Sequence, residues 1–600
     1  KSYDDLDLAV NNFTNLIQSA AWSSTVTSLK PSKTPAIPAH IREIIVEKRR
    51  SRALYQRTRL PSHKQKYNKL ANHLKKLLAK LKTKSFESFL TNLSANDGSL
   101  WKATKNACKT KAPNIPIKKN DGSFAISDTD KAELFKLHLS EIFQPHPDIA
   151  SPNNINSVEE FLNSPLPVAL PVKHFTPKEV KYAIDKYPLK KSPGFDHITA
   201  EVARCLPKKA IIHLTHLFNS VLRLSYFPSL WKFSIIILVP KPNKPPDSIS
   251  SYRPISLLPF FAKILERLLL KRILPCLTIN SILPNSQFGF RATHSTIHQV
   301  HRVVDAISYA LEKKLYCTCV FLDISQAFDR VWHHGLLFKL KKFLHPVYFL
   351  IIKSYLSDRY FSTRFGETLS SIAKISAGVP QGGILSPVLY NIYASDQPTS
   401  PNTLVADYAD DKAIISINND LVIASHQLQN HLSLMEEWYT NWRLKINQSK
   451  SMHCTFTLRP SPCPAVSIHG IPIPSSQTVK YLGLTLDRRL TWAHHIKSKR
   501  TNLNSRLRLL KTFINNNKFT NINSKLLIYK SLIKPVWTYG IQLWGNAKKS
   551  NLNKIHVFQN ITLKNITNAP FYVSYLSLHQ DLGIQPVITE AELFYKWFFC

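Results

Sequence analysis

The sequence predicts an α+β fold, and three observations lead to this class. From about residue 176 to 487, segments with helical spacing alternate with short β-rich runs such as "FSIIILVPKP" at Phe233–Pro242. A basic helical region precedes this part, and from Thr491 onward the pattern is mainly helical. With 44% hydrophobic residues, the 600-residue chain has the ordinary apolar content of a globular protein with a substantial core.

The charge of the chain is its most unusual property. Lys and Arg number 79 against 38 Asp and Glu, which gives a formal net charge of +41. Such an excess repels itself unless a polyanion neutralises it, so nucleic acid is the favoured partner and an anionic membrane surface the second. No apolar run approaches the roughly 18 residues of a membrane span, and "KSYDDLDLAV" at the start is not a signal peptide. The eight scattered cysteines are expected to be reduced thiols of a protein that is neither secreted nor membrane-bound.

Residues 1–143 are predicted to form a basic helical N-terminal region. Between Arg42 and Lys84 there are 15 Lys and Arg residues against Glu43 and Glu47, and leucines recur at helical spacing in "KLANHLKKLLAKL". This segment is either a solvated helix face or a basic helix that binds nucleic-acid phosphates. Under the second interpretation, the candidate nucleic-acid-binding residues are Arg49, Arg50, Lys75 and Lys76.

Turn and cap residues divide the rest of the chain. Residues 144–175 are rich in Pro, Asn and Ser and are predicted to be a linker. Thr176, Pro177 and Glu179 form a capping-box pattern with proline at the first helical position, so a helix is expected to follow. "CTCVFLDIS" and "YLGLTLD" (Tyr481–Asp487) are each predicted to be a strand of the region 176–487, whose core is about 220–487. Residues 488–600 are predicted to be helical. The chain begins without Met and ends inside an apolar pattern, as a piece of a longer protein would.

Three Asp residues are the main candidates for chemistry. Asp323 ends the strand-like run of "CTCVFLDIS", and Asp410 and Asp411 lie side by side in "VADYADDKAIIS", which is predicted to be a tight hairpin. Two carboxylates at about 4 Å repel by roughly 4 kcal/mol at an effective dielectric constant near 20, so such a cluster needs cations or must protonate. An all-carboxylate site suits Mg²⁺, and two ions would stabilise both oxygens of an in-line phosphoryl transfer. A bare pair of Asp residues in a turn is otherwise most often a solvated loop.

Two further groups of residues lie at the ends of predicted elements. "AGVPQGGILSPVLYNIY" is a loop that leads into an apolar helix, where glycine permits close backbone approach and Gln381 can hydrogen-bond a ligand. "LVPKPNK" and "SYRPISLLP" place Lys241, Lys244 and Arg253 where cations could hold a triphosphate. Each segment by itself is also compatible with a surface turn that carries basic residues.

Together and in this order, the segments resemble the reverse transcriptase of non-long-terminal-repeat (LINE-type) retrotransposons, in particular the jockey-like insect elements. The main resemblance runs from Lys190 to Asp487 and continues in C-terminal segments such as "SLIKPVWTYGIQLWG", so that it covers nearly the whole chain. The segments that carry it are "KKSPGFDHITAE", "LVPKPNK", "SYRPISLLP", "QFGFRATHST", "FLDISQAFDRVWH", "GVPQGGILSP", "YADD", "WRLKINQSKS" and "VKYLGLTLD".

The resemblance implies a right-hand polymerase fold with fingers, a palm built on an antiparallel sheet, and a thumb. By position in the motifs, Asp323 and Asp410 would hold two Mg²⁺ ions, which Mn²⁺ could replace, and Asp411 would have a lesser metal role. Phe328 matches the steric gate against a ribose 2′-hydroxyl. The remaining matches are Gln381 and Gly382 at the nucleotide and template, Lys241 and Arg253 at the triphosphate, and Lys450 as the group that protonates the leaving pyrophosphate.

The implied activity is RNA-templated DNA synthesis from dNTPs on a DNA primer, in a nuclear and cytoplasmic ribonucleoprotein. Two alternatives remain. One is an RNA-dependent RNA polymerase, in which Asp329 would take part, and the other is a domesticated or decayed copy that only binds RNA. Phe328 and "YADD" disfavour the first alternative, and the intact acids disfavour the second.

The sequence departs from the family pattern in several places. Gly383 stands where the family usually has Ser after "PQG", and Tyr408 stands where close relatives often have Phe. Residues 1–175 show none of the acidic and His pattern of the family's endonuclease domain. We therefore expect this chain not to nick DNA and an endonuclease to be supplied from elsewhere. The sequence predicts no particular oligomeric state.

Overall fold

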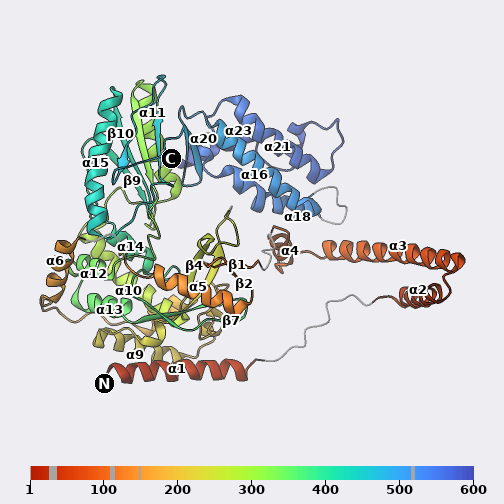
Figure 1. Ribbon diagram of the computed structural model, residues 1–600, viewed down its shortest axis with the longest axis horizontal. Coiled ribbons are helices and arrows are strands. Elements are labelled where there is room, and N and C mark those ends of the chain that lie inside the picture. The colour runs from red at the N-terminus through yellow and green to blue at the C-terminus, as the bar shows by residue number, and fades with distance from the viewer. Residues whose placement is uncertain are drawn as a thin grey trace. The chain divides into compact units, whose positions relative to one another are not determined.

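The computed structural model describes residues 2–25, 37–108, 115–119, 121–147, 151–242, 244–514 and 521–599. The chain divides into two compact units, of which unit 1 comprises residues 1–25 and 112–491 and unit 2 comprises 26–111 and 492–600. Helices and strands are mixed in unit 1, whereas the described part of unit 2 is helical (Figure 1). The predicted α+β class is confirmed.

In its described residues, unit 1 contains two larger sheets, three two-stranded sheets and the helices around them. Its helices are α1 (Tyr3–Ser23), α5 (Asp128–Ile142), α6 (Pro152–Asn163), α7 (Pro177–Asp185), α8 (Ala200–Arg204), α9 (Lys208–Leu224), α10 (Phe260–Ile279), α11 (Thr296–Glu312), α12 (His333–Lys341), α13 (Pro346–Leu356), α14 (Ser386–Tyr393) and α15 (Leu421–Asn441). Its strands are β1 (Ile117–Lys118), β2 (Phe124–Ala125), β3 (Ser234–Pro240), β4 (Tyr252–Leu257), β5 (Tyr316–Leu322), β6 (Arg359–Phe365), β7 (Thr368–Leu369), β8 (Ala373–Ile375), β9 (Thr403–Tyr408), β10 (Asp411–Asn418), β11 (Met452–Phe456), β12 (Ser467–Ile468), β13 (Ile471–Pro472), β14 (Thr478–Tyr481) and β15 (Leu484–Asp487).

The four-stranded sheet carries the acidic motifs. Its strand order is β11-β5-β10-β9, and all neighbouring strands are antiparallel. Every residue of β5 is buried, which explains why its sequence is apolar apart from Thr318 and does not alternate with exposed polar residues. Helices α11 and α15 pack against this sheet (Figure 1). The predicted strand in "CTCVFLDIS" and the predicted hairpin in "VADYADDKAIIS" are both confirmed.

The five-stranded sheet carries the basic motifs. Strand β3 pairs with β4 in antiparallel and with β6 in parallel orientation, and β7 and β8 both pair with β6. Helix α5 packs against β6. The run "FSIIILVPKP" is therefore the strand that was predicted, and it ends at Pro240, which has no backbone N–H to continue the ladder.

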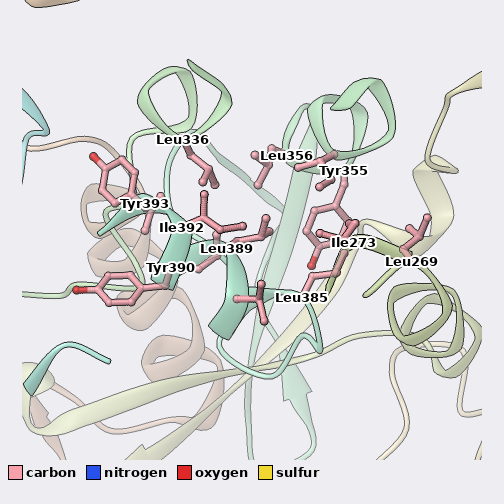
Figure 2. Packing of buried hydrophobic residues seen from close by; sticks show 14 of the residues in the cluster. Leu269, Ile273, Leu336, Tyr355, Leu356, Leu385, Leu389, Tyr390, Ile392 and Tyr393 are labelled. Carbon is pink, nitrogen blue, oxygen red and sulfur yellow. The ribbon is translucent and has the colours of Figure 1, made fainter. Parts of the chain in front are cut away.

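The largest hydrophobic core of the described residues joins the four-stranded sheet to the helices of unit 1, whereas Ile236 and Phe361 of the five-stranded sheet pack in a separate cluster with α5. Apolar side chains of α10, α12, α13 and α14 meet in the centre of the largest core, where Ile273, Leu336, Tyr355, Leu389 and Tyr393 are buried (Figure 2). The same cluster extends to Val320 and Leu322 of β5 and to Ile414 of β10. The ends of β5 and β10 are consequently anchored on a packed interior.

One predicted strand is wrong. "YLGLTLD" forms a hairpin with the residues before it, in which β14 pairs with β15 and Val479 lies opposite Leu486. The chain reverses at Leu482 and Gly483, whose φ angles are 42° and 86°. Such left-handed backbone is favourable for glycine, and the apolar residues on both sides of Gly483 concealed this turn in the sequence.

The packing of the N-terminal part differs from the predicted division at residues 143 and 175. Helix α1 buries Leu6, Val10 and Phe13 and packs against α9 of unit 1, because its apolar residues recur at helical spacing on one face. Helix α5 belongs to unit 1 as well, and the predicted linker contains α6, whose Val158 is fully buried. The capping box at Thr176 and Glu179 is present and begins α7 as expected.

Unit 2 is helical in its described residues, which agrees with the helical pattern predicted after Thr491. Helices α2 and α3 follow one another through Arg59, whose φ of 56° ends α2, and pack side by side. Among the described helices of the chain, none combines the length and the apolar character needed to cross a membrane. The elements of unit 2 are α2 (Ala39–Thr58), α3 (Pro61–Thr91), α4 (Ser99–Cys108), α16 (Ala493–Leu509), α17 (Lys511–Ile514), α18 (Ile522–Ile528), a π-helical turn (Tyr529–Ile533), α19 (Lys534–Thr538), α20 (Ile541–Trp544), α21 (Lys549–Thr567), α22 (Tyr575–Asp581) and α23 (Val587–Phe599).

A buried ion pair supports the hairpin of β9 and β10 from inside. Asp407 and Lys412 are 2% and 5% exposed, and Asp407 Oδ1 lies 2.6 Å from Lys412 Nζ. The amide of Gln397 donates to Asp407 and accepts from Lys412, and the hydroxyl of Ser286 donates to Asp407 Oδ2 at 3.0 Å. Asp407 is therefore a structural residue whose side chain points away from solvent.

Removal of one partner of this pair should be far more costly than removal of both. Asp407→Ala is expected to lower the free energy of unfolding by about 3–5 kcal/mol, because the ammonium group of Lys412 stays buried without its carboxylate. Urea unfolding followed by tryptophan fluorescence measures the loss. The double variant Asp407→Ala/Lys412→Met removes both charges and should recover most of the stability. A single variant as stable as the wild type would contradict this account.

Candidate active site

The three predicted acids meet at one end of the four-stranded sheet. Tyr408 of β9 pairs with Asp411 of β10, and the two-residue turn between them consists of Ala409, with a φ of 57°, and Asp410. Leu322 of β5 pairs with Lys412 of β10, so the same register places Asp323 opposite Asp411. The local sequence thus forms a tight hairpin whose tip presents Asp410 beside the end of the neighbouring strand.

The electrostatics of these carboxylates show that they interact. Burial raises the pKa of Asp410, and the charge of Asp323 raises it further, while Arg253 acts in the opposite direction. Burial also raises the pKa of Asp411 to about 6, with added contributions from Asp410 and Asp323. Among the described residues, the ion pair found at this cluster joins Lys450 Nζ to Asp323 Oδ2 at 3.6 Å. The site therefore has a surplus of negative charge that favours a bound cation.

The chemistry of the carboxylate oxygens, and not a preformed set of metal ligands, indicates that a divalent cation fits this site. In the described part of the chain, no three His, Cys, Asp or Glu side chains are close enough together to hold a metal ion as they stand. Asp323, Asp410 and Asp411 nevertheless offer only oxygen donors, and these repel one another. Oxygen donors of this kind match Mg²⁺, which usually combines one or two carboxylates with water and substrate phosphates.

Phe328 forms an aromatic wall near the acids. Its ring stacks on that of Tyr390, with centroids 4.5 Å apart, and meets the ring of Phe290 edge-on at 6.2 Å. Tyr390 itself is fully buried in α14 and is seen within the core in Figure 2. The backbone carbonyl of Phe328 accepts a hydrogen bond from the N–H of Val379 at 2.8 Å. Two ring contacts hold the side chain in place, and the hydrogen bond to its carbonyl holds the backbone.

The glycine-containing loop at residues 377–385 is held against β4. Ser256 N–H donates to the carbonyl of Gln381 at 2.8 Å, and Gly382 follows with a φ of 132°. A Cβ atom at Gly382 would lie 2.4 Å from the carbonyl oxygen of Ser256, so this position requires glycine. Gln381 and Gly382 therefore lie at the contact between this loop and strand β4 of the five-stranded sheet.

Asp329, which the sequence connects only with the alternative RNA polymerase, lies against the glycine-containing loop. The amide Nε2 of Gln381 donates to both of its carboxylate oxygens, at 2.8 and 2.9 Å. Its position directly after Phe328 was the available sequence signal. Asp329 consequently determines the orientation of the Gln381 side chain, which the sequence predicted only to lie in a loop and to be able to hydrogen-bond a ligand.

The predicted cations gather opposite the acids. Lys241 follows β3, and Arg253 of β4 pairs with Val239 across the sheet. Burial lowers the pKa of Lys241, and the like charges of Lys450 and Arg253 lower it further. Because Arg253 also acts on Asp410 and Asp411, the cations of one sheet and the carboxylates of the other share one electrostatic environment. This arrangement can hold a metal-bound polyphosphate.

The four predicted residues of the basic N-terminal region belong to unit 2 and not to this site. Arg49 and Arg50 lie on α2, Lys75 and Lys76 lie on α3, and all four are exposed. They are free to meet a polyanion at the surface of the helix pair.

Asp329 should make the stability of the chain depend on pH. Burial raises its pKa to about 7 from an ordinary 3.8, so the folded state keeps a proton that the unfolded chain releases. Its contribution to stability is therefore lost as the pH rises from about 4 to about 7. Relative to Asp329→Asn, the wild type should lose up to about 4 kcal/mol over this window, at about 1.4 kcal/mol per pH unit. Thermal unfolding of both proteins at several pH values tests this, and parallel curves would refute it.

Comparison with known proteins agrees with the motifs. Residues 239–486 match the family "Reverse transcriptase (RNA-dependent DNA polymerase)". The chain is 39% identical over 597 residues to the RNA-directed DNA polymerase from mobile element jockey of Drosophila melanogaster. The alignment covers 97% of this chain and 65% of the relative.

Two further relatives from the same organism show the same extent of similarity. The probable RNA-directed DNA polymerases from transposon BS and transposon X-element are 37% and 38% identical, over 98% of this chain and 66% of each relative. The chain thus spans about two thirds of the length of these relatives. The resemblance inferred from the motifs is confirmed: residues 239–486 match the reverse transcriptase family, and nearly the whole chain is similar in sequence to the polymerases of these mobile elements.

Proposed function

We propose that this chain is an RNA-directed DNA polymerase that copies retrotransposon RNA into DNA from dNTPs. The observation that carries the proposal is the meeting of Asp323, Asp410 and Asp411 with the cations Lys241 and Arg253 in one environment. A site that joins carboxylates, cations and a glycine-dependent loop suits the transfer of a nucleotidyl group. The reverse transcriptase family of residues 239–486 supports this chemistry over other phosphoryl transfers.

In the proposed reaction, the primer 3′-hydroxyl attacks the α-phosphorus of a dNTP. Asp323 and Asp410 would hold two Mg²⁺ ions, with a lesser role for Asp411, and Mn²⁺ could replace them. When bound, the two ions supply charge stabilisation at the attacking and leaving oxygens. Lys241 and Arg253 bind the triphosphate, and Lys450 Nζ donates a proton to the leaving pyrophosphate.

The remaining site residues select the nucleotide. Phe328, held between Tyr390 and Phe290, would exclude the 2′-hydroxyl of a ribonucleotide by close contact. The Gln381 amide is oriented by Asp329. Gly382, whose backbone comes close to the carbonyl of Ser256, would hold the loop where it meets the nucleotide and template. An apolar pocket without close contact discriminates against a hydroxyl only about a hundredfold, so a fixed wall is the better device.

The right-hand polymerase arrangement can be proposed for the observed sheets. The sheet β11-β5-β10-β9 would be the palm, the sheet of β3, β4 and β6 would belong to the fingers, and the helices from α16 onward would form the thumb and downstream region. Template RNA and primer DNA would be gripped by their backbones, with α2 and α3 as a basic surface for phosphates. An endonuclease acting on the genomic strand would be a partner, and the work would take place in a nuclear and cytoplasmic ribonucleoprotein.

Two alternative functions predict different products. An RNA-dependent RNA polymerase would prefer NTPs, and a silent RNA-binding copy would yield no extension at all. Asp329 is buried, and its neighbour in the sequence is the bulky Phe328. A bulky side chain at this position would exclude the 2′-hydroxyl of an NTP, so it favours dNTPs as substrates. Extension of a DNA primer on an RNA template with each set of nucleotides separates the three functions.

Asp410→Asn is expected to reduce primer extension more than about a thousandfold, because metal-borne stabilisation of the transition state amounts to several kcal/mol. RNA binding should be retained. Asp420→Asn is the matched control, since Asp420 caps α15 and Asn is an equally good N-cap. Unchanged product from Asp410→Asn would sink the assignment of this site.

Phe328→Val should weaken the discrimination between dNTPs and NTPs. The ratio of kcat/KM values is expected to fall to about a hundred or less, which is what an apolar pocket provides without a close wall. Steady-state primer extension with each nucleotide measures the ratio. Phe338→Val, at a residue that packs against Trp442 away from the acids, should leave the ratio as it is. A folded Phe328→Val protein with wild-type selectivity would contradict the gate.

If the basic side chains of α2 and α3 bind phosphates, they should make the affinity for nucleic acid depend more steeply on salt concentration. Arg49→Gln/Arg50→Gln and Lys75→Gln/Lys76→Gln are each expected to reduce the slope of log K against log salt by about 1.4 to 1.8, at about 0.7–0.9 per phosphate contact. Fluorescence anisotropy with an RNA–DNA hybrid over a range of salt concentrations measures the slope. Lys208→Gln/Lys209→Gln on α9 is the control of equal charge. If all three double variants give the same slope, the helix pair is only a solvated face.

A further inference from the structure

The segment 286–289 lies along the edge strand of the four-stranded sheet. Asp407 N–H donates to the carbonyl of Ser286 at 3.0 Å, and Phe288 N–H donates to the carbonyl of Asp407 at 2.9 Å. These bonds make a parallel bridge between Gln287 and Asp407. Strand β9 is the edge of this sheet and pairs with β10 on its other side. The segment 286–289 therefore covers the open edge of β9 next to the hairpin turn.

The side chain of Gln287 reaches past this bridge to the turn itself. Its Oε1 accepts hydrogen bonds from the N–H of Ala409 and the N–H of Gly289, both at 2.8 Å. Its Nε2 donates to the carbonyl of Ala409 at 3.3 Å. Gln287 is only 4% exposed, so these hydrogen bonds lie in a protected environment where they are strong. One amide thus binds both polar backbone groups of the residue directly before Asp410.

Ala409 needs such support because of its conformation. It has a φ of 57°, and the left-handed region is sterically unfavourable for any residue with a Cβ atom. The turn that carries Asp410 is therefore not the conformation that its own sequence prefers. An external clamp that fixes the N–H and the carbonyl of Ala409 compensates for this preference.

Gly289 allows the clamp to come close enough. A Cβ atom at this position would lie 2.3 Å from the backbone nitrogen of Ala409. The carbonyl of Gly289 accepts a hydrogen bond from Asn391 Nδ2 of α14 at 2.8 Å, which fixes the segment from the other side. Two backbones in direct contact and one buried amide between them leave the turn little freedom to shift.

We propose that Gln287 is a positioning residue for nucleotide transfer: its amide fixes the turn at Ala409 and thereby the carboxylate of Asp410. The inference rests on the proposed polymerase function, in which Asp410 holds a metal ion. In this proposal Gln287 acts through its hydrogen bonds to the backbone of Ala409. A displacement of about 1 Å in an active-site group can cost about a hundredfold in rate, so a loosened turn should reduce turnover although the acids remain.

The test compares two glutamines that support the same segment. Gln287→Met removes the clamp with little change of volume. Gln299→Met is the matched control, since Gln299 Nε2 donates to the carbonyls of Ser286 and Asp407, at 2.9 and 2.8 Å, and makes no hydrogen bond to the turn. Primer extension on an RNA template gives kcat, the KM for dNTP and the Mg²⁺ concentration for half-maximal rate. Thermal unfolding and RNA binding are measured alongside.

Gln287→Met is expected to lower kcat about tenfold or more and to raise the half-maximal Mg²⁺ concentration several-fold, with the KM for dNTP nearly unchanged. Gln299→Met should lower the unfolding temperature to a similar extent while its kcat and Mg²⁺ dependence stay as in the wild type. Gly289→Ala pushes the segment away from Ala409 and should reproduce the kinetic effect of Gln287→Met. If Gln287→Met does not fold, Gly289→Ala tests the proposal in its place.

Two results would overturn the proposal. One is a folded Gln287→Met or Gly289→Ala protein with wild-type kcat and Mg²⁺ dependence. The other is an equal kinetic effect in Gln299→Met, because the loss would then come from the packing of the segment and not from the clamp. Wild-type extension that Asp410→Asn abolishes shows that the polymerase function holds independently of these outcomes, so failure of the clamp and failure of the function are distinguishable.

Discussion

The repulsion among the carboxylates of Asp323, Asp410 and Asp411 is the constraint on which the rest of unit 1 depends. Antiparallel pairing of β5 and β10 brings these groups to one end of a sheet, and burial raises the pKa of Asp410 and Asp411. Such a cluster is stable only in a framework that resists its separation and beside cations that offset its charge. The packed core beneath β5 and β10 supplies the framework, and Arg253 and Lys450 supply part of the charge.

The loop that faces these acids is held from several directions by buried polar groups. Glu266 is fully buried, and burial raises its pKa, while the N–H groups of Ile384 and Leu385 and the hydroxyl of Tyr355 donate to it. A Cβ atom at Gly383 would lie 3.2 Å from Glu266 Oε2, so the departure from the usual serine leaves room for this arrangement. Together with the hydrogen bonds from Gln381 to Asp329, these contacts hold the loop at several points, which favours one defined conformation over many.

Much of the fold could be predicted because local patterns decide it. Strands β3 and β5 are mostly apolar, the helix at Pro177 begins with a capping box, and the hairpin of β9 and β10 carries Asp410 and Asp411 at its turn. The hairpin at Leu482 and Gly483 was missed because apolar residues flank its turn and hide the period of the strands. The membership of α1 in unit 1 was missed because nothing within Tyr3–Ser23 tells which distant helix its apolar face contacts.

The sequence by itself predicted the class of fold, the resemblance to a family and the three Asp residues that the structure brings to one end of a sheet, since these predictions follow from residue type, spacing and order along the chain. Tertiary structure alone decided how the acids and their neighbours are held. Gln287 and Ala409 are 122 residues apart, and Asp329 and Gln381 are 52 apart, yet each pair is joined by hydrogen bonds. Such contacts depend on how sheets and helices pack, which no local pattern encodes. The left-handed turn before Asp410 is the clearest case, because the residue that supports it, Gln287, lies 122 residues before Ala409 in the sequence.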